Sequence, residues 1–157
     1  MTVAPSHGHP RSPRSRPRLN HVAVPVPADL LDEQGRADIL DFYGDVLGWT
    51  EGDNTGERGN PLILYTGEFG EFLYLAPDDE ASDAPVDHVG MQVATLEDLE
   101  AIVARVRARQ VHDDRVEVSD IGARATHGPS GDYTLSSAYI RFVLPFSIEL
   151  QHIARKP

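Results

Sequence analysis

Two short stretches, LNHVAVPV at residues 19–26 and VDHVGMQV at residues 86–93, match each other and decide the fold prediction. Aligned with an offset of 67 residues, they share a histidine, the valine after it and the final valine. Each alternates apolar with more polar or smaller residues, which is typical of a strand with one buried face. A repeat of this kind indicates two copies of one supersecondary unit.

The residues after each stretch repeat the same plan. Residues 36–48 carry apolar side chains at helical spacing and end in a glycine. Residues 96–110 have the same spacing and follow Thr95, which forms a capping-box pattern with Asp98. Further strands are predicted around Trp49 and at 61–67, 70–77, 111–119, 133–144 and 145–153, with a long glycine-rich loop at 119–132. The order is therefore strand, helix and three strands, twice.

Alternation along the strands places His21, His88 and Glu149 on the less apolar faces of their strands. A single histidine in a strand is most often structural, hydrogen-bonded to a neighbour or facing water. Here, however, both halves hold a histidine at the same place, and the last strand adds a carboxylate that would be costly to bury alone. Two imidazoles and a carboxylate on the concave side of a curved sheet indicate a divalent-metal site.

Composition narrows the class of protein. The 157 residues are enough for one domain, and the absence of cysteine excludes disulfides and thiolate metal sites. The sequence contains no apolar run long enough for a membrane helix and no secretion signal, so we expect a cytoplasmic protein. Residues 19–157 contain 10 basic and 25 acidic residues, a net charge of −15, which argues against nucleic acid as a partner.

The first 18 residues differ in composition from the rest. They hold four arginines, no acidic residue and many prolines and serines. We therefore expect residues 1–18 to form a disordered basic arm, in front of a single domain at 19–153. Within that domain, module one is predicted at 19–77 and module two at 86–153.

The motifs NHVAVPV, DFYGDVLGW, DHVGMQV and SIELQ together resemble the vicinal oxygen chelate superfamily. This superfamily includes glyoxalase I, bleomycin-resistance proteins, fosfomycin-resistance enzymes and extradiol dioxygenases. The resemblance covers roughly residues 19–153. It implies an α+β fold in which two βαβββ modules form a cupped, mostly antiparallel sheet with helices on its outer face. It also implies a homodimer as the common assembly.

The resemblance implies metal ligands at four positions. His21 and His88 match the ligands on the opening strands of the modules, and Glu149 matches the carboxylate on the last strand. Glu71 is the candidate fourth ligand, with exposure in a hairpin as the alternative. The His21–Glu71 and His88–Glu149 separations, 50 and 61 residues, differ by about the length that the 119–132 loop adds. The metal would be Fe, Mn, Zn or Ni.

The reaction that the resemblance implies is chelation of two neighbouring substrate oxygens, followed by lyase, isomerase or epimerase, or dioxygenase chemistry. Glu149 or Glu71 would act as the base, and the candidate substrate-binding residues are Gln92, Gln151, Tyr139 and His127. His127 lies in the glycine-rich loop, which would close over a small-molecule substrate. For each of these four residues, a surface or packing role is the alternative.

The sequence departs from the pattern of the superfamily at two points, and one rival function remains. Pro145-Phe146-Ser147 stands where many relatives have a Pro-Asp-Gly turn, and we find no arginine pair placed for glutathione. The rival function is a metal-free protein that sequesters a cationic drug, as in the bleomycin-resistance branch, which the acidic charge would suit. The three ligand-type residues favour the enzyme.

Overall fold

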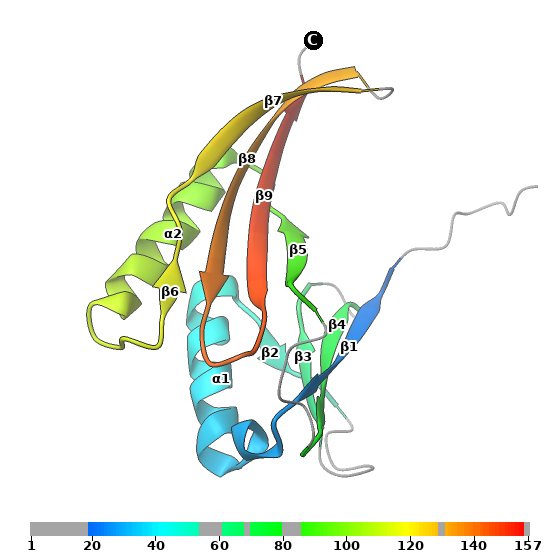
Figure 1. Cartoon of the computed structure of the whole chain (residues 1–157), viewed down its shortest axis with the longest axis vertical. Helices are drawn as coiled ribbons and strands as arrows, with labels where there is room; N and C mark the ends of the chain where they lie inside the picture. The colour runs from blue at the N-terminus through cyan, green and yellow to red at the C-terminus, as the bar shows by residue number, and fades with distance from the viewer. Residues whose placement is uncertain (1–18, 54–60, 68–69, 80–85, 129–130, 156–157) are drawn as a thin grey trace, which may run out of the picture.

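The structure is a computed structural model that describes residues 19–53, 61–67, 70–79, 86–128 and 131–155. Each half of this part of the chain forms its own sheet (Figure 1). The first sheet has the order β1-β4-β3-β2, and the second has β5-β9-β8-β6, with β7 also paired to β8. The strands are β1 His21–Val26, β2 Thr50–Glu51, β3 Leu62–Tyr65, β4 Phe72–Pro77, β5 His88–Gln92, β6 Glu117–Val118, β7 Gly122–Gly128, β8 Gly131–Arg141 and β9 Ser147–Arg155.

The two sheets share one pairing rule. The opening strand of each half pairs in parallel with the last strand of that half, β1 with β4 and β5 with β9. The remaining pairs are antiparallel. This arrangement confirms the predicted α+β fold of two βαβββ modules, here as two mixed sheets. It also leaves β1 and β5 at the sheet edges, each paired with one described strand.

Local sequence signals explain where the two helices begin and end. Helix α1 (Glu33–Leu47) follows the short 3-10 helix η1 (Ala28–Leu31), and the Asp32 side chain caps it by accepting from the backbone N–H of Gly35. It ends at Gly48, whose φ of 73° is readily adopted by glycine. Helix α2 (Leu96–Gln110) has the predicted capping box between Thr95 and Asp98.

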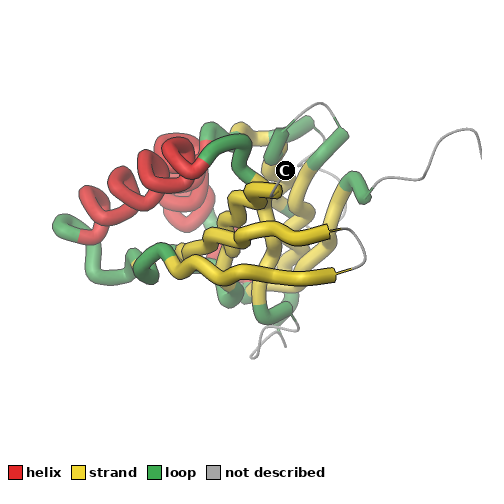
Figure 2. Tube along the Cα trace, turned by 90° about the horizontal axis from the view of Figure 1, so that it is seen from above, coloured by secondary structure: helices red, strands yellow, loops and turns green. Residues whose placement is uncertain are grey.

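One hydrophobic core joins the two halves. The helices lie together on one side of the strands (Figure 2). The ring of Phe42 on α1 stacks on Phe142, which follows β8, with 4.5 Å between centroids. The Tyr43 hydroxyl donates to the Phe142 carbonyl oxygen at 3.1 Å, and burial raises the pKa of this phenol. The module-one helix is therefore anchored to module two.

The segment between α2 and β8 differs from its prediction. The strand predicted at 111–119 is reduced to Glu117–Val118, because a turn precedes it in which Asp113 accepts from the backbone and side chain of Arg115. The predicted loop at 119–132 contains β7, which pairs with β8 over its whole length. The residues of β7 are mostly exposed, so no apolar alternation marks the strand, and backbone pairing with β8 holds it in place.

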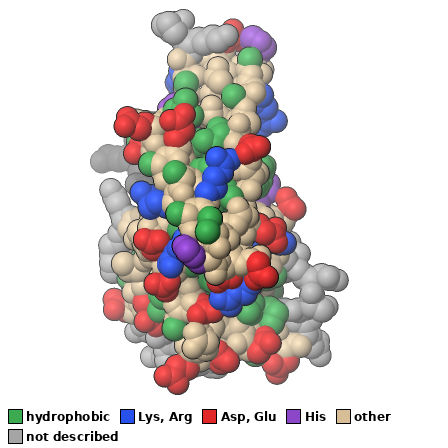
Figure 3. Space-filling model, turned by 90° about the vertical axis from the view of Figure 1, so that its left-hand side faces the viewer, with side chains coloured by type: hydrophobic (Ala, Val, Ile, Leu, Met, Phe, Trp, Pro, Cys, Tyr) green, Lys and Arg blue, Asp and Glu red, His purple; other side chains and the backbone are tan. Residues whose placement is uncertain are grey.

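The surface over α2 carries interspersed acidic and basic side chains (Figure 3). Arg107 pairs with Asp120, and Arg109 pairs with Asp41 and Asp45 on α1. None of the helices that the structure describes has the length and apolarity to cross a membrane. The predicted basic arm at 1–18 lies outside the described residues.

Candidate functional site

Glu149 is the central residue of the candidate site. It lies on β9, only 6% exposed, between the core residues Ile148 and Leu150. Burial raises the pKa of its carboxyl group, but hydrogen bonds with Gln151, Tyr139 and Ser137 and the nearby His88 imidazole outweigh burial and hold the pKa below its usual range. The carboxylate is therefore ionised at neutral pH and already surrounded by polar partners.

His88 lies beside this carboxylate on the neighbouring strand. The β5–β9 pairing sets Gly90 opposite Glu149, so the His88 side chain has no bulky neighbour between it and the carboxylate. Its Nε2 is 3.3 Å from Oε2 of Glu149, and its Nδ1 is 2.8 Å from Oδ2 of Asp87. Asp87 thus fixes the ring and turns Nε2 towards Glu149, which is the arrangement that orients a metal-binding histidine.

Tyr139 lies next to the His88–Glu149 pair. It lies on β8 directly opposite Glu149, and its ring meets the His88 ring edge-on at 5.7 Å between centroids. Its hydrogen bond to Glu149 raises the pKa of its hydroxyl group. The ring is 41% exposed, so it remains accessible to a small molecule at the site.

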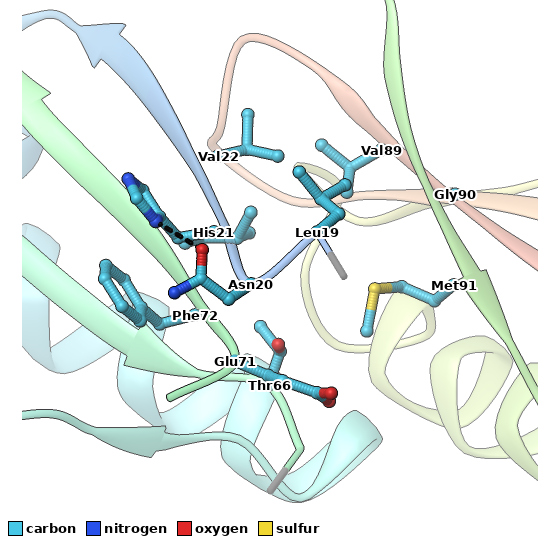
Figure 4. Close-up of a pocket in the computed structure, with 11 residues that line it drawn as sticks. Leu19, Asn20, His21, Val22, Thr66, Glu71, Phe72, Val89, Gly90 and Met91 are labelled. Atoms are coloured by element: carbon cyan, nitrogen blue, oxygen red, sulfur yellow. Dashed lines mark hydrogen bonds between the residues drawn. The ribbon is translucent and has the colours of Figure 1, made fainter. Parts of the chain in front are cut away.

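His21 lies elsewhere in the same chain. It is exposed on the edge strand β1, its ring stacks on Phe72 at 4.8 Å, and its Nδ1 is 3.0 Å from Oδ1 of Asn20. His21 and Glu71 line a hollow of about 200 Å³ whose other wall includes Val89 and Met91 of β5 (Figure 4). These two side chains lie on the opposite face of β5 from His88, as the alternation of its residues requires.

The strand register shows which module-one residue is the counterpart of Glu149. In module two, Gly90 pairs with Glu149, and in module one the equivalent Ala23 pairs with Tyr74. The counterpart is therefore Tyr74, and the equivalence of Glu71 and Glu149 inferred from sequence spacing is wrong. Glu71 precedes Phe72, which pairs with His21, and its carboxylate points away from the His21 ring (Figure 4).

The described residues contain no group of three or more His, Cys, Asp or Glu side chains that could hold a metal ion within one chain. The structure brings His88 and Glu149 together with Tyr139 and Gln151, and it places His21 and Glu71 apart from them.

The remaining predicted substrate-binding residues lie at different distances from Glu149. Gln92 pairs with Gln151, two residues along the strand from Glu149 and on the same face of the sheet. His127 lies on β7 and not in a loop, and it pairs with Asp132 at 2.9 Å.

Three residues near the site were not singled out from the sequence. Asp87 stands directly before His88 in the repeated stretch, and this adjacency was a usable signal. Ser137 and Arg124, which line a hollow beside Glu149, carried no comparable signal. Arg124 falls in the segment that was predicted as a loop, so its direction could not be inferred.

Comparison with known proteins identifies the family. The model of the Glyoxalase/Bleomycin resistance protein/Dioxygenase superfamily matches residues 18–131. The chain belongs to this superfamily. No curated protein matches its sequence.

Solved structures with the same fold include FosX, a fosfomycin resistance protein of Listeria monocytogenes, in complex with Mn(II) and sulfate. It is 14% identical, with a TM-score of 0.57 over 90% of this chain and 93% of that one. A virulence protein of Salmonella typhimurium is 17% identical, with a TM-score of 0.55 over 88% and 98%. A protein from the mobile metagenome of V. Pseudocholerae is 18% identical, with a TM-score of 0.56 over 90% and 98%.

Proposed function

We propose that this superfamily member is a divalent-metal-dependent enzyme that acts on a small oxygenated substrate, with His88 and Glu149 as two of its metal ligands. The observation that carries the proposal is the 3.3 Å approach of His88 Nε2 to Glu149 Oε2. Ligand bonds of about 2.1 Å at right or tetrahedral angles separate two donor atoms by about 3.0–3.4 Å. The pair therefore fits a shared divalent ion.

His21 is the proposed third ligand, contributed by a second copy of the chain. β1 and β5 are both edge strands, and an unpaired sheet edge favours pairing with another chain. If β1 of one copy lies beside β5 of the other, the equivalent histidines of the two modules approach each other. A two-fold symmetric dimer would then contain two identical sites. Each would combine His21 from one copy with His88 and Glu149 from the other.

Three ligands fit this chain better than four. The position equivalent to Glu149 holds Tyr74, which would place an aromatic ring where a fourth carboxylate would be needed. Glu71 points away from His21 (Figure 4). Two histidines and one carboxylate leave open positions on the ion for a substrate. FosX, which shares the fold, has been crystallised with Mn(II), so manganese is the first metal to test.

The proposed chemistry divides between the ion and the protein. A bound divalent ion would chelate two neighbouring oxygens of the substrate and stabilise negative charge that develops on them. Asp87 holds the His88 ring in place, and Tyr139, Gln151 and Ser137 hold the Glu149 carboxylate ionised and in position. The exposed ring of Tyr139 borders the place where a substrate would lie. We propose an isomerase, lyase or dioxygenase reaction.

A metal titration tests this proposal. The full chain, stripped with a chelator, is titrated with Mn(II) by calorimetry, and its metal content is measured after reconstitution. We expect one ion per chain in the wild type and none in His88→Ala, because removing one of three ligands leaves a weak site. His127→Ala, which changes an exposed histidine outside the site, should bind as the wild type does. Wild-type protein that binds no metal at stoichiometry would reject the enzyme in favour of a metal-free binding protein.

A further inference from the structure

Arg124 lies beside the candidate site and faces a hollow of about 230 Å³. The hollow is lined by Arg124, Ser137, Tyr139 and Glu149 together with small or apolar residues of β7 and β8. The β7–β8 register sets Arg124 opposite Leu135 and Gly122 opposite Ser137, and Tyr139 follows two residues further along β8. Because Gly122 has no side chain, the space between Arg124 and Ser137 stays open.

Arg124 also differs from four other arginines of module two. Arg107, Arg109, Arg115 and Arg141 each form an ion pair with a carboxylate. Arg124 is exposed and makes no hydrogen bond or ion pair with another described residue. Carboxylates are abundant in a folded part with a net charge of −15, and one of them, Glu149, lines the same hollow. Arg124 nevertheless forms no ion pair with a described carboxylate, so its five N–H donors are free for a ligand.

We propose that Arg124 binds an anionic group of the substrate, of which a carboxylate is the simplest case. This inference rests on the proposed function, because it assigns the substrate of the site at His88 and Glu149. The substrate class is then a small acid with two neighbouring oxygens for the metal and a carboxylate for Arg124. A guanidinium group is suited to this task because it donates two parallel hydrogen bonds to a carboxylate.

The charge distribution explains why this arginine would decide specificity. The Glu149 carboxylate lies in the same hollow and keeps its negative charge, but its oxygens are engaged by Tyr139, Gln151 and Ser137, whereas Arg124 has no hydrogen-bond partner among the described residues. An anionic group of a ligand would therefore find free hydrogen-bond donors on the Arg124 side of the hollow.

A matched pair of ligands tests the inference. The monohydroxamate of succinic acid and its neutral amide analogue present the same two chelating oxygens and differ in one carboxylate. We expect the Mn(II)-loaded wild type to bind the acid about tenfold more tightly than the amide, as one charge-assisted hydrogen-bonded pair would give. Arg124→Gln should bind both equally, Arg124→Lys should keep part of the preference, and Arg107→Gln, with the same loss of charge on α2, should keep all of it.

Measurements on the metal-free protein separate this inference from the proposed function. The side-chain N–H resonances of the arginines are followed by NMR as either ligand is added. A shift of the Arg124 signal with the acid alone, lost in Arg124→Gln, supports the anion site even if the chain binds no metal. If the acid leaves that signal unchanged, or if Arg124→Gln retains the preference for the acid, the inference is overturned, whatever the metal titration shows.

Discussion

The two modules share one plan, yet they present their site residues differently. In module two, β5 and β9 place His88 and Glu149 within 3.3 Å on one face of the sheet. In module one, the same pairing of β1 with β4 sets His21 against Phe72 and places Tyr74 where a carboxylate would be. The backbone repeat therefore supplies two equivalent positions, which carry different side chains in the two modules.

The largest expected effect comes from a matched pair of glutamate substitutions, one in each module. Glu149→Gln removes the charge of the carboxylate that the structure pairs with His88, and we expect Mn(II) affinity to fall by at least ~100-fold, as for loss of a direct ligand. Glu71→Gln should leave the affinity within about twofold, because Glu71 is not the counterpart of Glu149. Calorimetric titration measures both. An equal loss in the two variants would show that Glu71 also binds the ion.

A second comparison concerns the cores of the two sheets. Leu75 on β4 and Leu150 on β9 occupy equivalent places in the register and are both buried. Leu75→Ala and Leu150→Ala should each lower the free energy of unfolding by about 2–5 kcal/mol, since each leaves a cavity in the shared core. Urea denaturation measures the loss. If one substitution costs under 1 kcal/mol, the two halves do not share one cooperative core.

Asp87 gives a smaller effect that is confined to module two. Asp87→Asn keeps the size of the side chain but removes the charge that holds Nδ1 of His88. We expect Mn(II) affinity to fall about tenfold with no change in thermal stability, the usual consequence of losing a group that orients a ligand. In module one, Asn20 contacts the His21 ring, so Asn20→Ala is the comparison variant. Unchanged affinity in Asp87→Asn would mean that the Asp87–His88 pair has no role in metal binding.

The smallest expected effect depends on pH and involves the contact between α1 and the turn that follows α2. The hydrogen bond from Gln34 and the Arg115 guanidinium lower the pKa of Asp38, and Arg115 also lowers the pKa of Asp113. A lowered carboxyl pKa stabilises the fold above the unfolded-state value, and this contribution is lost as the pH falls below about 4. Arg115→Gln should therefore lower the Tm slightly at pH 7 and by less at pH 3. Equal Tm values at pH 7 would contradict this.

The sequence contained enough to predict the modules but not the relation between them. The capping residues Thr95 and Asp98 fixed the start of α2, and the faces of β1, β5 and β9 followed from alternation. β7 was missed because its exposed strand has no apolar period. The counterpart of Glu149 was misassigned to Glu71 because spacing along the chain says little about strand register, and register depends on pairing with a neighbouring strand.

Mixing two defective variants shows whether the metal site is shared between two copies of the chain. His21→Ala and His88→Ala are each expected to bind no Mn(II) alone. After unfolding and refolding together in equal amounts, half of the dimers should be mixed, and each mixed dimer should hold one intact site. Mn(II) binding should therefore return to about a quarter of the wild-type amount. Binding that stays absent in the mixture, while refolded wild type binds fully, would contradict the shared site.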